Sequence, residues 1–84
     1  MIEYAVITGA SSGLGKAFAF ELAKRKINVV LISLPHEGLP EMATQLMKYS
    51  IEVAWYETDL TVHENVRLVT DWINDHFSVS LLSN

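Results

Sequence analysis

Hydrophobic and polar residues along this chain follow two periodicities in turn. Four short runs are rich in β-branched and aromatic residues, as strands are, and they lie at residues 4–7, 28–33, 51–57 and 78–84. Between them, hydrophobic residues recur every three or four positions, as on one face of a helix, at residues 13–26, 39–49 and 61–77. Strands that alternate with single helices favour a parallel sheet, so the pattern predicts an α/β fold with four strands and three helices.

The hydrophobic face of each helix predicts which side chains it buries. The first helix would bury Leu14, Ala17, Phe18 and Leu22, the second Leu39, Met42, Ala43, Leu46 and Met47, and the third Val62, Val66, Val69, Ile73 and Phe77. Leu68 and Trp72 lie off the third face. Thr61 and Glu64 have the spacing of a capping box, and Pro40 fits the first turn of the second helix.

Two of the strands differ in how far their faces are covered. Residues 28–33 are continuously apolar, as in a parallel strand that is buried on both faces. Residues 51–57 alternate only in part, which indicates a strand at the edge of the sheet with one less protected side.

The composition restricts the classes of function. Eighty-four residues, half of them hydrophobic, are enough for one small globular domain. A formal net charge of −4 argues against a general affinity for nucleic acid or anionic membrane. The lack of cysteine excludes disulfides and thiolate metal sites, and His63 and His76 are too far apart on one helix to form a ligand pair. We expect no membrane span, no signal peptide and a cytoplasmic location.

The glycine-rich stretch from Thr8 to Gly15 joins the first strand to the first helix. Gly9 can take a backbone angle that is closed to other residues, and Gly13 and Gly15 allow a ligand or a neighbouring strand to approach closely. The unpaired amides at the helix start attract anions. With hydroxyl donors from Ser11 and Ser12, the stretch predicts a diphosphate-binding turn; the alternative is a glycine-rich turn without a ligand.

The spacing Thr-Gly-x-x-x-Gly-x-Gly resembles the cofactor loop of the short-chain dehydrogenase/reductase family. The resemblance implies a partial Rossmann fold: parallel strands in the order 3-2-1-4, three α/β/α layers, and a cofactor, NAD or NADP, at the switch point. It implies cofactor contacts from Gly9, Ser11, Ser12, Gly13, Leu14, Gly15, Ser33, Leu34, Asp59, Leu60 and Asn84. Two helices would cover one face of the sheet and the third helix the other.

The residues after the second strand depart from the family pattern. An acidic residue for NAD or a basic residue for NADP is expected there, but this chain has Leu34, Pro35 and His36. The choice between NAD and NADP therefore stays open. Glu37 could reach a ribose hydroxyl and His36 a 2′-phosphate, or each is a solvated loop residue.

Two further positions follow from the resemblance. Asp59 and Leu60 match the pair that contacts adenine in the family, although Asp59 could instead only brace the loop before the third helix. Asn84 matches the first residue of the family's Asn-Asn-Ala-Gly motif, which lies beside the adenosine ribose.

The catalytic Ser and Tyr-x-x-x-Lys of the family have no counterpart in this chain. Residues 4, 49 and 56 are tyrosines, and the residues four positions later are Thr8, Val53 and Leu60. Since carbonyl reduction requires a matched proton donor, we expect residues 1–84 to be inactive alone and to form the cofactor-binding N-terminal part of a longer NAD(P)-dependent oxidoreductase.

A second hypothesis is a complete short protein that binds nucleotide or regulates a full-length relative through mixed dimers.

A third hypothesis concerns assembly and rests on the last strand, because the apolar residues 79–82 would have no neighbouring strand on their outer side. An open apolar edge favours pairing with another chain, so we expect a homo-oligomer joined through it.

Overall fold

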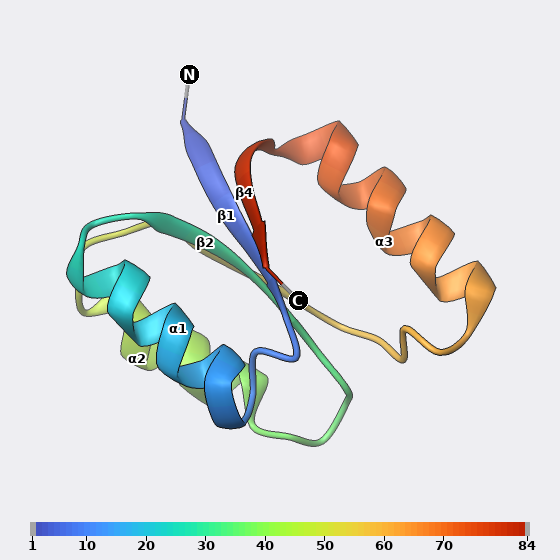
Figure 1. Cartoon of the computed structure of the whole chain (residues 1–84), viewed down its shortest axis with the longest axis horizontal. Coiled ribbons are helices and arrows are strands. Elements are labelled where there is room, and N and C mark those ends of the chain that lie inside the picture. Colours follow the sequence, from blue (N-terminus) through green and yellow to red (C-terminus); the bar gives the residue numbers. More distant parts are fainter. Residues whose placement is uncertain (1, 84) are drawn as a thin grey trace.

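The computed structural model describes residues 2–83 and forms a four-stranded parallel sheet with three helices. The elements are β1 (Glu3–Thr8), α1 (Gly13–Lys24), β2 (Asn28–Ser33), α2 (Leu39–Met47), β3 (Val53–Glu57), α3 (His63–His76) and β4 (Ser78–Ser83). The strand order is β3-β2-β1-β4, which confirms the predicted topology. Figure 1 shows α1 and α2 together on one side of the sheet and α3 on the other.

The sheet separates two hydrophobic clusters because successive side chains of a strand point to opposite faces. Ala5 and Ile7 of β1 lie in the cluster under α1 and α2, whereas Val6 lies in the cluster under α3. All residues of β2 from Val29 to Ser33 are buried, as the continuous apolar run predicts. β3 is an edge strand with partly exposed residues, which confirms the interpretation of its alternating pattern.

The buried face of α1 differs from the prediction. Leu22 is buried as expected and Phe18 packs at the margin of the core, but Leu14 is 85% exposed and Ala17 is also exposed. The buried positions are instead Ala19 and Ala23, together with Leu22. Two of the three alanines of α1, Ala19 and Ala23, therefore face the sheet, where small side chains let the helix lie close to it.

Several hydrophobic residues of α2 and α3 also lie outside the core. Met47 ends α2 and is exposed, although the other four predicted residues of that helix are buried. Val62 and Val66 are exposed at the start of α3, because the helix packs on the sheet through its C-terminal half. There Trp72, which lies off the predicted face, packs with its ring centre 4.9 Å from those of Tyr56 and Phe77.

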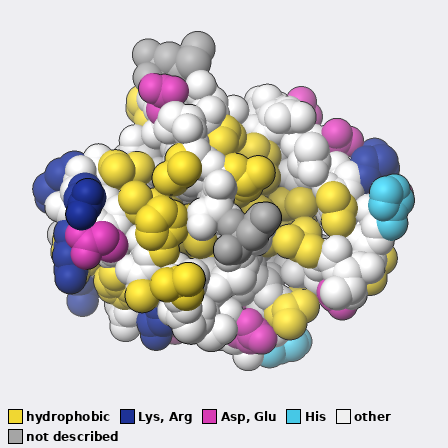
Figure 2. Space-filling view, viewed as in Figure 1, with side chains coloured by type: hydrophobic (Ala, Val, Ile, Leu, Met, Phe, Trp, Pro, Cys, Tyr) yellow, Lys and Arg dark blue, Asp and Glu magenta, His cyan; other side chains and the backbone are white. Residues whose placement is uncertain are grey.

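The outer side of β4 is open. Val79, Leu81 and Leu82 are all exposed, and a register shift between Tyr4 and Ala5 interrupts the pairing of β4 with β1. In Figure 2, hydrophobic side chains gather in the middle of the face, where Figure 1 shows β1 and β4, and lysine and arginine side chains lie at the margins. Within residues 2–83 no helix combines the length and the hydrophobicity needed to cross a membrane.

Candidate functional site

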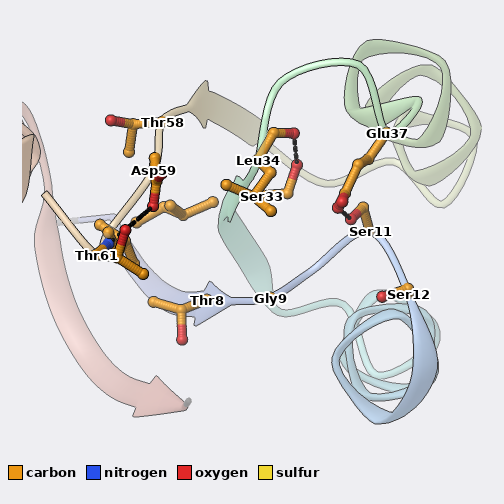
Figure 3. A pocket seen from close by; sticks show the side chains of 12 residues that line it. Thr8, Gly9, Ser11, Ser12, Ser33, Leu34, Glu37, Thr58, Asp59 and Thr61 are labelled. Atoms are coloured by element: carbon orange, nitrogen blue, oxygen red, sulfur yellow. Dashed lines mark hydrogen bonds between the residues drawn. The ribbon is translucent and has the colours of Figure 1, made fainter.

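A pocket of about 480 Å³ opens where β1, β2 and β3 end. This is the carboxyl edge of the parallel sheet, where ligands bind in open α/β folds. The residues that line it are Thr8, Gly9, Ser11, Ser12, Ile32, Ser33, Leu34, Glu37, Thr58, Asp59, Leu60 and Thr61 (Figure 3). The three loops that follow the strands therefore meet around one cavity.

The loop after β1 and the first turn of α1 each contain a position that favours glycine. Gly9 has a φ of +62°, in the left-handed region that other residues rarely adopt. A Cβ on Gly15 would lie 2.3 Å from the carbonyl oxygen of Gly9, so the first turn of α1 touches the loop backbone directly. The amide of Ala10 donates to the carbonyl of Ile32 at 3.0 Å and fixes the loop to the end of β2.

The start of α1 borders the pocket. Ser12 is the residue before the helix; its backbone is extended and its side chain makes no capping hydrogen bond. Lys16 donates its amide to the carbonyl of Ser12, so the helical hydrogen bonds begin there. Amides in the first turn have no partner inside the helix and lie at its positive end. Ser11, Ser12 and this turn together offer hydrogen-bond donors to an anion.

Glu37 and Ser11 connect the first two loops. The Ser11 hydroxyl donates to Oε1 of Glu37 at 2.5 Å, which joins the loop after β1 to the loop after β2 (Figure 3). Between β2 and α2 the backbone turns through left-handed conformations at His36 and Gly38, whose φ angles are +67° and +78°. This turn carries the side chain of Glu37 back toward the pocket.

Asp59 braces the loop after β3. Its Oδ1 accepts the Thr61 hydroxyl at 2.6 Å and the Thr61 amide at 2.9 Å, and these two hydrogen bonds lower the pKa of the Asp59 carboxyl. The predicted capping box is wrong, because the Thr61 hydroxyl bonds to Asp59 and Glu64 pairs with Arg67. Asp59 also lines the pocket, so it remains available to a ligand.

A family model described as short chain dehydrogenase matches residues 3–84. The chain belongs to the short-chain dehydrogenase family. It is 59% identical to 17-beta-hydroxysteroid dehydrogenase type 3 of Homo sapiens over 46 residues, 55% of this chain and 15% of that protein. It is 35% identical to very-long-chain 3-oxoacyl-CoA reductase of Scheffersomyces stipitis, over 98% of this chain and 25% of that protein. The chain thus spans a quarter or less of these relatives' lengths.

Solved structures of short-chain dehydrogenases share this fold. The short-chain dehydrogenase from Sphingobium yanoikuyae in complex with NADPH superposes with a TM-score of 0.86 and 27% identity, over 95% of this chain and 32% of that one. The likeness therefore covers nearly the whole of this chain and about a third of the other protein.

The structure brings most of the predicted cofactor residues of this short-chain dehydrogenase together. Seven of the predicted residues line the pocket, and these are Gly9, Ser11, Ser12, Ser33, Leu34, Asp59 and Leu60. Gly13, Leu14 and Gly15 form the first turn of α1 beside the pocket without lining it, and Asn84 lies outside the described residues.

Other lining residues were not among the predicted contacts. Each of Thr8, Ile32, Thr58 and Thr61 is next in sequence to a predicted residue, and this adjacency is the signal that could have identified them. Thr8 also donates its hydroxyl to the carbonyl of Ser83 at 3.3 Å, which ties β1 to the end of β4. Within residues 2–83 no three His, Asp or Glu side chains are placed to hold a metal ion.

Proposed function

We propose that residues 1–84 form the cofactor-binding N-terminal part of an NAD(P)-dependent short-chain oxidoreductase. The main support for the proposal is the contact between Gly15 and Gly9. It packs the start of α1 against the loop after β1, at a point where Gly9 has a left-handed backbone and lines the pocket. This arrangement exposes backbone amides to an anion and leaves no room for a side chain at Gly15. The complex of the Sphingobium yanoikuyae enzyme with NADPH supports it.

Three groups of residues at the pocket would contact three parts of a dinucleotide. The first turn of α1, with Ser11 and Ser12, would bind the diphosphate. Ser33 and Leu34 would lie beside the adenosine ribose, and Asp59 and Leu60 would contact the adenine. Gly13, Leu14 and Asn84 complete the proposed contacts. The bound cofactor supplies or accepts a hydride, and the substrate of the whole protein is a carbonyl compound or an alcohol.

We also infer that the chain alone is inactive. Its sequence contains no Tyr-x-x-x-Lys, and proton transfer to a carbonyl oxygen needs such a donor. The matched segment makes up 15% of one relative and 25% of the other. The catalytic residues would therefore lie in a part of the whole protein that residues 1–84 do not include. The cytoplasmic location stays a prediction from the sequence.

The test is calorimetric titration of the chain with ADP-ribose, which holds the diphosphate common to NAD and NADP. Wild-type protein should bind, and Gly15→Ala should weaken binding by roughly tenfold or more, because the new methyl group must displace the loop backbone by about an ångström. Ala19→Gly is the control: it destabilises the same helix from a buried position without touching the loop. If the two variants bind ADP-ribose equally well, the proposed diphosphate-binding turn is wrong.

A second proposal is self-association through the open edge of β4, as a homo-oligomer or as a regulatory module that pairs with a longer relative. Its support is the exposure of Val79, Leu81 and Leu82 on a strand that pairs on one side with β1. Sedimentation at micromolar concentration should reveal a dimer or a larger species. A single monomeric species would contradict the proposal.

A further inference from the structure

The two serine hydroxyls of the glycine-rich loop differ in what they contact. The Ser12 side chain is exposed and makes no capping hydrogen bond at the start of α1. The Ser11 hydroxyl donates its hydrogen to Oε1 of Glu37, and Figure 3 shows the Ser11 side chain turned toward that carboxylate. A serine hydroxyl has one hydrogen to donate. While the bond to Glu37 is made, the Ser11 hydroxyl therefore has no hydrogen left for a ligand.

The carboxylate of Glu37 is held in this position by little besides the bond to Ser11. The backbone turns through left-handed conformations on either side of it, at His36 and Gly38, and this turn directs the side chain toward the loop after β1. Glu37 is exposed, and no lysine or arginine of residues 2–83 forms an ion pair with it. The carboxylate can therefore rotate into solvent without loss of burial or of an ion pair.

A carboxylate and a diphosphate compete for the same kind of partner. Both are anions that accept hydrogen bonds, so Glu37 takes in the free chain a donor that the diphosphate would use. Among the described residues that line the pocket, Glu37 and Asp59 are acidic and none is a lysine or an arginine. A diphosphate that approaches the start of α1 is thus also repelled by the carboxylate that occupies Ser11.

We propose that Glu37 is an autoinhibitory side chain: its bond with Ser11 closes the diphosphate-binding turn, and a ligand must displace the carboxylate before the Ser11 hydroxyl can donate to it. The inference rests on the proposed function. Glu37 acts here on the free chain and at the diphosphate, so the effect does not depend on any contact with a ribose. Because only the fraction of molecules with an open turn is ready to bind, the closed form lowers the apparent affinity.

The experiment is a titration of the chain with inorganic pyrophosphate, which contains no ribose and no base, followed by nuclear magnetic resonance of the amides of residues 13–15. Glu37→Ala removes both the acceptor and the charge, and it should tighten binding roughly threefold or more relative to wild type. Glu41→Ala is the matched control: it removes a carboxylate from the first turn of α2, outside the lining of the pocket, and should leave the affinity nearly unchanged. Equal tightening in both variants would overturn the inference in favour of net charge.

Ser11→Ala separates the hydrogen bond from the repulsion between charges. Without the Ser11 hydroxyl, the loss of Glu37 releases no donor, so Glu37→Ala should tighten pyrophosphate binding less in the Ser11→Ala background than in wild type. The same gain in both backgrounds would show that repulsion alone limits binding and would overturn the inference.

The failure of this inference is distinguishable from the failure of the proposed function. If Glu37→Ala binds pyrophosphate with wild-type affinity, Glu37 is not inhibitory, and the proposed diphosphate-binding turn still stands. If pyrophosphate shifts the amides of neither protein, the inference is wrong as well, and the titration with ADP-ribose decides the proposed function by itself.

Discussion

The two faces of the sheet are packed to different degrees. Under α1 and α2, thirteen buried residues form one cluster, which includes Ile7, Leu31, Leu39 and Leu46. Under α3, four buried residues form the other cluster, and only Val69 of these comes from the helix. The first face is closed by aliphatic side chains from two helices, whereas the second is covered largely by partly exposed aromatic rings.

The pocket lies at the carboxyl edge of the sheet, where loops that lead to both faces meet. The loop after β1 and the turn after β2 lead into α1 and α2, and Ala10 of the first loop belongs to the cluster under these helices. Ile32 and Leu60 also line the pocket; Ile32 belongs to the cluster under α3, and Leu60 packs against it. Hydrogen bonds from Thr61 to Asp59 hold the loop before α3 in addition. Both faces therefore help to position the residues proposed for the diphosphate and the adenine.

The largest expected difference between the two faces is in how much a core substitution lowers the free energy of unfolding. Leu46→Ala removes a fully buried side chain of α2 and should lower the free energy of unfolding by about 2–5 kcal/mol, a large part of the stability of so small a domain. Val69→Ala loses fewer carbons from a cluster with exposed margins, so it should cost less than half as much. Urea denaturation followed by circular dichroism measures both changes. Equal losses would mean that α3 is packed as firmly as α2.

The open edge of β4 and the exposed surface of α3 should differ in how much each contributes to self-association. Leu82→Lys should weaken the proposed self-association by roughly tenfold or more, because a charge at an edge strand opposes pairing between sheets. The free energy of unfolding should change little, since Leu82 is 65% exposed. Leu68→Lys places the same charge on the exposed surface of α3 and is the control for sedimentation. A similar loss of assembly in both variants would move the interface away from the edge of β4.

The strands, the helices and the glycine loop could be predicted from the sequence because each depends on local chemistry, whereas the strand order followed from the resemblance to the family. A continuous apolar run such as residues 28–33 is typical of a strand that is covered on both faces. The left-handed angle at Gly9 and the contact at Gly15 follow from the absence of a Cβ. The types of these residues are therefore enough to predict the strand and the glycine loop, without reference to distant parts of the chain.

The errors concern features that depend on distant parts of the structure. Periodicity shows which side of a helix is apolar, but not how far the sheet extends beneath it, so Val66 was expected to be buried. Leu14 was assigned to the core because of its helical spacing from Phe18 and Leu22, whereas Ala19, which is off that spacing, is buried. The contact of Glu37 with Ser11 joins residues 26 positions apart through a left-handed turn, and no local pattern predicts it.

The smallest expected effect concerns the loop before α3 and its response to pH. The hydrogen bonds from Thr61 lower the pKa of Asp59 below its ordinary value of 3.8, so the folded state binds its proton less readily than the unfolded state. The stabilisation is fully present above that ordinary value and is lost as the pH falls from it through the lower pKa of the folded state. Asp59→Asn should therefore lower the melting temperature at pH 6, and the difference from wild type should shrink as the pH falls below 3.8. Asp75→Asn, an exposed position on α3, is the control, and the same pH response there would show that the Thr61 hydrogen bonds do not stabilise the loop.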